Sequence, residues 1–303
     1  MDKAKTTVYF FKIFIMRPLY SIYQVCYNSL DLHLQKRGPM KFWTIDSFTN
    51  QAFKGNPAGV CIVEKFPDIN LMQQIANEIN LSETTFVVHK TAGQYDIRWF
   101  TPTTEVELCG HATLAAAHAL WNELHIPHDV IHFNSLSGEL IATLNAHEIT
   151  LDFPAYENTK VDMSDDMANA LGIAPIAIHK AHDDWIVELE HFRDVVNLNP
   201  NISQLSLIPC RGIIVTAKGD DEYDFFSRFF APREGVNEDP VTGSAHCKLA
   251  PYWAERLGKN TMIAYQASKR GGVVKVRFEN NRVYLTGEAI TVIQGKIMYD
   301  YQS

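Results

Sequence analysis

The sequence predicts an α+β protein built of two similar lobes that face each other across a cleft. Three observations support this fold class. Strand-like and helix-like patterns alternate along the chain from residue 40 onward. One order of elements, ending in an apolar helix, occurs twice. The length of 303 residues fits two domains of ordinary size.

The composition excludes several broad classes of protein. With 46% hydrophobic and 20% charged residues the chain is typical of globular proteins, and its 16 Gly and 13 Pro exclude a collagen-like or low-complexity chain. The formal net charge of −8 argues against a dedicated nucleic-acid-binding protein, because that affinity rests on a basic surface. We therefore expect no nucleic acid as a partner.

The first 39 residues differ from the rest of the chain. They carry a net charge of +4, whereas residues 40–303 carry −12. Lys12 and Arg17 interrupt any membrane-spanning helix, and a secretory signal would need a cleaner apolar stretch. The basic and aromatic bias faintly resembles an organelle presequence or a membrane-surface segment. We interpret residues 1–39 as an extension outside the fold, ahead of a natural start at Met40, and expect no membrane partner.

The first half of the folded part is predicted to hold strands and two helices. Tyr95–Phe100 alternates apolar and polar residues, as a half-buried strand does. Asp68–Asn80 has the apolar spacing of an amphipathic helix, whereas Gly110–Leu124 has almost no polar face, which predicts a buried helix. The other predicted strands are Phe42–Phe48, Gly59–Glu64, Thr84–Val88, Glu139–Leu144 and Glu148–Phe153.

The second half behaves similarly. A helix is predicted from Gly243 to Leu257. The predicted strands are Ile176–His179, Asp184–Glu188, Gly212–Ala217, Tyr223–Phe230, Val273–Phe278, Arg282–Thr286 and Ala289–Ile297.

An internal repeat relates the two halves. Each half has a strand ending in Phe-x-Pro, an acidic loop, a glycine turn and a buried helix. The copies contain Phe100-Thr101-Pro102 with Gly110, and Phe230-Ala231-Pro232 with Gly243. We interpret the repeat as a duplication that brings both helix N-termini to the cleft. Free N–H groups there would bind an anion such as a carboxylate, and the two glycines would let it approach closely.

Four polar side chains near these features are candidates for chemistry. Glu83 lies between a helix and a strand, and His111 lies in the first turn of the first buried helix. Asp239 and Ser244 flank the start of the second. Ordinary explanations compete with these roles: a solvated loop carboxylate, a core histidine, and helix capping by Asp239 and Ser244. Because a helix N-terminus disfavours a charged imidazole, we expect His111 to be neutral.

Cysteine and histidine patterns predict neither a disulfide framework nor a metal site. The five cysteines form no C-x-x-C pair, which favours a reducing, cytoplasmic location. The helix dipole could activate Cys109 as a thiolate, but the counterpart of Cys109 in the repeat is Thr242, which disfavours a two-thiol racemase. An exposed linker explains His125, His128 and His132 better than a metal site does.

Six motifs occur in order between Met40 and the C-terminal region: Asp46-Ser47-Phe48-Thr49, Gly55-Asn56-Pro57-Ala58, Leu81-Ser82-Glu83-Thr84, Phe100-Thr101-Pro102, Glu107-Leu108-Cys109-Gly110-His111-Ala112-Thr113 and Glu238-Asp239-Pro240-Val241-Thr242-Gly243-Ser244-Ala245-His246. Together they resemble the PhzF-like phenazine-biosynthesis isomerase family. Residues 1–39 lie outside the resemblance. Thr242 is a departure from the related two-cysteine epimerases.

The resemblance implies the diaminopimelate-epimerase-like fold, in which each lobe is a curled mixed sheet, or barrel, around a central helix. We expect lobe 1 at residues 40–157, lobe 2 at 158–286, and a strand within 287–303 that returns to lobe 1. The resemblance also implies a homodimer and chemistry without a cofactor. The family's glutamate, histidine, aspartate and serine match Glu83, His111, Asp239 and Ser244.

The hypothesis from the sequence is an isomerase that shifts a proton within a small cyclic or unsaturated carboxylate. Glu83 moves the proton, His111 and Asp239 hydrogen-bond the substrate, and the carboxylate is held by Gly110, Gly243 and Ser244. Two alternatives stay open. One is an epimerase or racemase of a small amino or hydroxy acid with Glu83 or Cys109 as a base. The other is a non-catalytic protein-binding member of the same fold.

Overall fold

The structure is a computed structural model that describes residues 40–162 and 165–298. Both lobes lie within one compact unit, Lys41–Gly295. The segment 1–39, interpreted above as an extension, lies outside the described residues, and the expected lobe boundaries stay a prediction. In the described part of the chain, no helix is long and apolar enough to cross a membrane.

Lobe 1 is built around the buried helix α3 (Gly110–His118), which packs against β2, β3 and β8. The predicted α-helix is shorter than expected, because the chain continues from His118 into a π-helical turn, η2 (Ala119–Glu123). The amphipathic helix α2 (Ile69–Ile79) contacts β3 and β4. The strands are β1 (Met40–Ser47), β2 (Asn56–Val63), β3 (Glu83–Thr91), β4 (Gln94–Phe100), β5 (Glu105–Val106), β6 (Val130–Ser135), β7 (Gly138–Asn145) and β8 (Glu148–Pro154).

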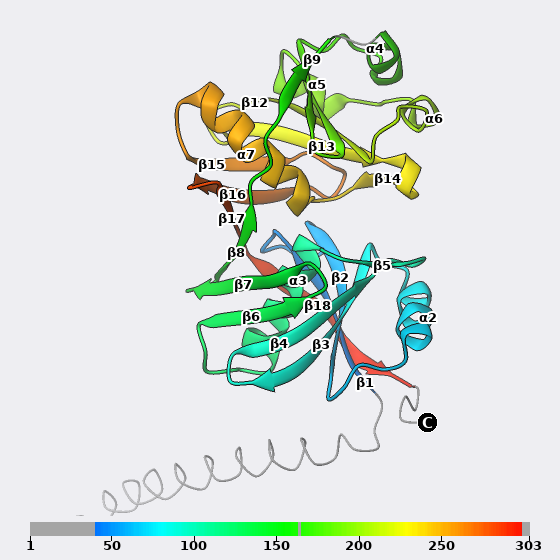
Figure 1. Cartoon of the computed structure of the whole chain (residues 1–303), viewed down its shortest axis with the longest axis vertical. Helices are drawn as coiled ribbons and strands as arrows, with labels where there is room; N and C mark the ends of the chain where they lie inside the picture. The colour runs from blue at the N-terminus through cyan, green and yellow to red at the C-terminus, as the bar shows by residue number, and fades with distance from the viewer. Residues whose placement is uncertain (1–39, 163–164, 299–303) are drawn as a thin grey trace, which may run out of the picture. The chain divides into compact units, whose positions relative to one another are not determined.

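Lobe 2 is built around α7 (Gly243–Leu257), which packs against β16 and β17 (Figure 1). Its strands are β9 (Thr159–Val161), β10 (Ala177–Ala181), β11 (Asp184–Glu188), β12 (Gly212–Lys218), β13 (Phe225–Ala231), β14 (Val236–Asp239), β15 (Thr261–Gln266), β16 (Gly272–Glu279) and β17 (Arg282–Gly287). The shorter helices are α4 (Asp165–Leu171), α5 (Phe192–Asn197), α6 (Ile202–Leu205) and η3 (Pro232–Glu234). The last strand, β18 (Ala289–Ile297), pairs with β1.

The two lobes share one strand pattern. In lobe 1, β2 is parallel to β3, β4 is antiparallel to both β3 and β5, and β6 is parallel to β4. In lobe 2, the five strands β11, β12, β13, β14 and β15 repeat the same four relations in the same order. The internal repeat inferred from the sequence is therefore confirmed, and it extends well beyond the Phe-x-Pro and glycine positions.

An arginine–glutamate pair occupies the same place in each lobe. Arg98 on β4 pairs with Glu105 on β5 at 2.6 Å and lies 5.4 Å from the centre of the Phe100 ring. Arg228 on β13 pairs with Glu238 on β14, also at 2.6 Å, and lies 5.0 Å from the Phe230 ring. In both copies the pair fastens the short strand that leads to the buried helix.

The lobes meet along an antiparallel ladder between β8 and β17, in which Leu151 pairs with Leu285. The ladder joins the strands of both lobes into one mixed sheet. Most of the regular structure is strand, and the central helices α3 and α7 are buried. These observations confirm the α+β fold class of two similar lobes.

The core around α7 gives a direct test of packing. The Trp253 side chain is 1% exposed, stacks on Phe225 at 5.7 Å, and donates a hydrogen bond from Nε1 to Thr216 Oγ1 at 3.0 Å. We expect Trp253→Ala to lower the free energy of unfolding by about 3–5 kcal/mol, because it leaves a cavity. Leu207→Ala, at a side chain that is 78% exposed, should change it by less than about 0.5 kcal/mol. Urea denaturation measures both, and equal effects would contradict this packing.

Candidate active site

The starts of the two buried helices face each other. A Cβ atom added to Gly110 would lie 3.4 Å from the Cα of Gly243, and the reverse distance is the same. Cys109 and Thr242 precede the helices, and neither side chain caps its helix. Backbone N–H groups with partial positive charge therefore converge from both lobes, and this arrangement favours an anion.

Glu83 and His111 form a close pair in lobe 1. Glu83 is the first residue of β3, beside Ala58 of β2, and His111 is the second residue of α3. His111 Nε2 lies 3.1 Å from Glu83 Oε2, and the side chains are only 5% and 18% exposed. Both atoms are buried, yet the angle between them does not make a regular hydrogen bond. Each therefore keeps hydrogen-bonding capacity for a ligand.

Asn56 connects His111 to lobe 2. Its fully buried amide donates from Nδ2 to Asp239 Oδ1 at 2.8 Å and to the Val241 carbonyl at 2.9 Å, and lies 3.2 Å from His111 Nδ1. Ser82, next to Glu83, donates to Asn56 Oδ1 at 3.3 Å. The sequence placed Asn56 within a motif but not within the site. Its partners lie 26 to 185 residues away along the chain, so only the fold reveals them.

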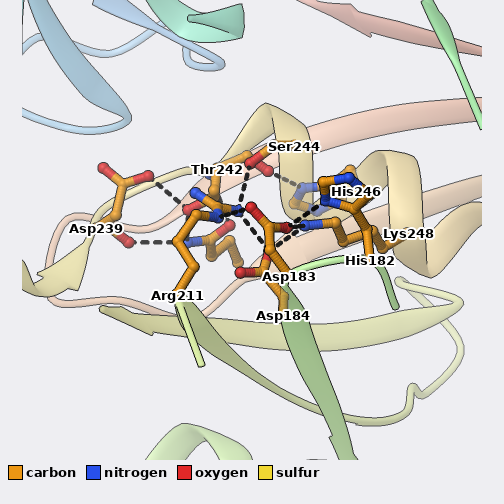
Figure 2. A network of polar contacts seen from close by, with 10 residues as sticks. His182, Asp183, Asp184, Arg211, Asp239, Thr242, Ser244, His246 and Lys248 are labelled. Carbon is orange, nitrogen blue, oxygen red and sulfur yellow. Dashed lines mark hydrogen bonds and ion pairs between the residues drawn. The ribbon is translucent and has the colours of Figure 1, made fainter. Parts of the chain in front are cut away.

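Asp239 ends β14 and faces the start of α7 (Figure 2). It accepts hydrogen bonds from Asn56 and from the Thr242 hydroxyl, while Gln266 donates to its carbonyl oxygen at 2.8 Å. Asp239 does not cap the helix, and neither does Ser244, so the capping explanation considered for both is wrong. Burial, and secondarily the charge of Glu83, raise the pKa of Asp239 from 3.8 to about 6.

The protonation of His111 differs from the expectation. Burial disfavours charge on this imidazole, but the Glu83 carboxylate 3.1 Å away raises its pKa above the ordinary value of 6.5. The direction of this shift is opposite to the one that the helix dipole alone predicts, because the dipole favours a neutral imidazole.

Cys109 is not an activated thiolate. Its sulfur lies 3.5 Å from His111 Nδ1, but burial and then the Glu83 charge raise the thiol pKa to about 11. The thiol is therefore protonated at neutral pH, and the suggested activation by the helix dipole is wrong.

One group of possible metal ligands occurs among residues 40–162 and 165–298. Single ligand atoms of Glu83, Cys109 and His111 lie within 4.8 Å of one another. His125, His128 and His132 do not form such a group in that part of the chain.

Ser244 lies in the first turn of α7, directly after Gly243. Its hydroxyl oxygen accepts a hydrogen bond from Arg211 Nη2 at 3.3 Å (Figure 2). The structure thus brings Glu83, His111 and Asp239 into one network through Asn56, next to the facing helix starts that carry the remaining candidates, Gly110, Gly243 and Ser244.

A fold of two duplicated lobes with acid–base side chains at their facing helix starts defines an enzyme of the isomerase kind. The chain matches the PhzC-PhzF family model, described as phenazine biosynthesis-like protein, over residues 45–295. It belongs to this family, and the resemblance stated from the sequence is confirmed.

Named relatives agree with this assignment. A Halalkalibacterium halodurans protein named an uncharacterized isomerase is 49% identical, with 84% of this chain and 97% of that protein covered. A Pseudomonas aeruginosa protein with the same description is 45% identical, with 85% and 98% covered. The crystal structure of a PhzF-family phenazine biosynthesis protein from Enterococcus faecalis is 40% identical, with a TM-score of 0.84 and coverage of 86% and 100%. The chain is an isomerase of this family, and none of these names states a substrate.

The pKa of Asp239 predicts a stability difference that depends on pH. The folded-state pKa of about 6 exceeds the ordinary 3.8, so the protonated acid favours the fold and the carboxylate opposes it as pH rises through 6. We expect Asp239→Asn to raise the free energy of unfolding at pH 7.5 by about 1–2 kcal/mol, after allowance for partial exposure. The gain should shrink toward zero near pH 4.

Denaturant unfolding across this pH range measures the difference. Asp129→Asn, at an exposed position, is the matched control and should follow the wild-type curve. An Asp239→Asn variant that is less stable than wild type at pH 7.5 would contradict the raised pKa.

Proposed function

We propose that the chain isomerises a small cyclic or unsaturated carboxylate by moving a proton from one carbon to another, with Glu83 as the base and then the acid. The observation that carries this proposal is the Glu83–His111 pair. Two buried polar atoms 3.1 Å apart, each without a regular hydrogen-bond partner, lie in the network beside the facing helix starts. A bound substrate would supply the missing partners.

The helix starts supply the binding part of the mechanism. Backbone N–H groups at Gly110 and Gly243, with the Ser244 hydroxyl, hold the substrate carboxylate. Because the carboxylate is fixed by both lobes, the adjacent carbon is placed beside Glu83. Fixing that geometry in advance lowers the barrier to proton transfer.

The remaining side chains stabilise charge during the transfer. The His111 imidazole, whose pKa is raised, donates a hydrogen bond to the substrate as negative charge develops on its conjugated system. Asp239 has a pKa of about 6 and can therefore donate or accept a hydrogen bond near neutral pH. Glu83 returns the proton at the second carbon, so that the double bond changes position while atoms and charge balance.

Deuterium exchange separates this reaction from its rivals. Candidate carboxylates that raise the melting temperature of the protein are incubated with it in D₂O and followed by NMR. Deuterium with relocation of a double bond supports an isomerase, whereas deuterium at one carbon with inversion supports an epimerase. Stabilising ligands that show neither deuterium exchange nor a relocated double bond support the non-catalytic alternative. The protonated Cys109 thiol makes a second, sulfur base unfavourable.

Glu83→Gln tests the assigned base on the substrate so identified. We expect kcat to fall by about 10²–10⁴-fold, because amide nitrogen and oxygen cannot carry the proton. Glu107→Gln is the matched control, since Glu107 is an exposed residue of the loop before α3, and it should stay within about twofold of wild type. A Glu83→Gln enzyme with wild-type turnover eliminates this mechanism.

The resemblance also supports a homodimer, which we propose as the working form. Light scattering coupled to size-exclusion chromatography should give twice the mass of 34.4 kDa.

A further inference from the structure

A cluster of charged side chains lies behind Ser244 in lobe 2 (Figure 2). Asp184, the first residue of β11, is fully buried and accepts short contacts from both Arg211 and Lys248. Asp183 pairs with Arg211 at 2.9 Å and with Lys248 at 2.6 Å. The mechanism proposed above does not use these four residues.

The cluster is balanced, so its cations are not free to bind a substrate. Burial opposes charge on Asp183, but hydrogen bonds from Lys248 and His182 and the Arg211 charge hold its pKa well below the ordinary value. Burial likewise opposes charge on Arg211, yet the two aspartates raise its pKa. Two carboxylates thus face two cations, and each arginine or lysine charge is already neutralised.

Arg211 differs from Lys248 in one contact. Ser244 and Lys248 lie one turn apart on α7, so they share a face of the helix. Arg211 Nε lies at ion-pair distance from Asp183, 2.9 Å, without a regular hydrogen bond, whereas Nη2 donates to both Asp184 and Ser244. The ring of Phe229 lies 5.3 Å from the guanidinium carbon and limits its movement. Because the cluster fixes the position of the Arg211 guanidinium, Arg211 also fixes the orientation of the Ser244 hydroxyl.

The direction of this hydrogen bond fixes what Ser244 can do. A hydroxyl has one proton to donate, and arginine has donors only. Arg211 thus occupies a lone pair of Ser244 Oγ and leaves its proton free. Among the described residues, no hydrogen bond donated by Ser244 Oγ is present.

We propose that Arg211 is a positioning residue, which orients and polarises the Ser244 hydroxyl so that its proton is donated to the substrate carboxylate. The inference rests on the proposed function, because it assigns Ser244 to the same anion site. A charged donor on the oxygen polarises the hydroxyl and so strengthens the hydrogen bond that its proton donates. Lysine at this position keeps the charge, but a single ammonium cannot reproduce the planar fork that reaches two aspartates and the serine.

Benzoate is the probe for this proposal, because it is a planar unsaturated carboxylate. It is titrated at constant ionic strength into the full chain, and the amide resonances of Gly243 and Ser244 are followed by NMR, with benzamide as the uncharged comparison. We expect Arg211→Lys and Ser244→Ala each to weaken benzoate binding about tenfold. The double variant should also be about tenfold weaker, since both changes act through one hydroxyl.

Arg282→Lys is the matched control. Arg282 forms a similar ion pair with Asp152, at 2.9 Å, and makes no hydrogen bond to Ser244 among the described residues. This variant should bind benzoate as wild type does. Thermal unfolding of each variant verifies the fold. Wild-type affinity for benzoate in Arg211→Lys would contradict the role of Arg211 but not the anion site. The same holds if the double variant binds benzoate about a hundredfold more weakly than wild type does. If benzoate causes no chemical-shift change at Gly243 and Ser244 of the wild-type protein, the anion site is contradicted, and with it both proposals.

Discussion

The close approach of α3 and α7 is the constraint on which the site depends. Two helix N-termini that face each other bring partial positive charges together, and this is unfavourable unless negative charge lies nearby. A Cβ atom on either Gly110 or Gly243 would lie in van der Waals contact with the Cα of the other, at 3.4 Å, so a longer side chain at either position would occupy the space between the helix starts. Glu83 and Asp239 supply acidic groups at the same place. The packing of the two lobes therefore also favours negative charge between the helix starts.

Asn56 links this constraint to the side chains. A buried amide with contacts to His111 and Asp239 lets each lobe fix the position of a polar group in the other. His111 in turn lies 3.1 Å from Glu83, so acid–base groups from distant parts of the chain form one set of close polar contacts. A change in how the lobes pack would alter the protonation of this set as well as its geometry.

Local patterns in the sequence predicted much of the fold. The helix Gly243–Leu257 and the strands Asp184–Glu188 and Ala289–Ile297 were predicted with their observed bounds. Their apolar spacing and neighbouring turn residues determine these elements locally. The sequence analysis missed β5, β6, β9, β14 and β15. Of these, β5, β9 and β14 are only two to four residues long and show no periodicity, so long-range pairing alone defines them.

The site was predictable only in part. Motifs singled out Glu83, His111, Asp239 and Ser244, but their contacts depend on residues far away in the chain. The charge of His111 illustrates the limit, since a helix position is visible in the sequence and a neighbouring carboxylate is not. Arg211 carries no local signal at all: it precedes an ordinary buried strand. The repeated Arg-x-Phe-x-Pro at 98–102 and 228–232 was visible and would have strengthened the case for duplication.

The facing helix starts have an evolutionary consequence. Their N–H groups belong to the backbone, so an anion bound there would be held whichever side chains line the reacting part of the site. Substitutions elsewhere in the site can therefore change which reacting group is accepted, while the acidic group of the ligand is still bound by the backbone. The duplicated fold thus assigns anion binding to the backbone and the reaction to side chains. Sequences with this fold can therefore acquire new substrate specificities without first losing affinity for the ligand.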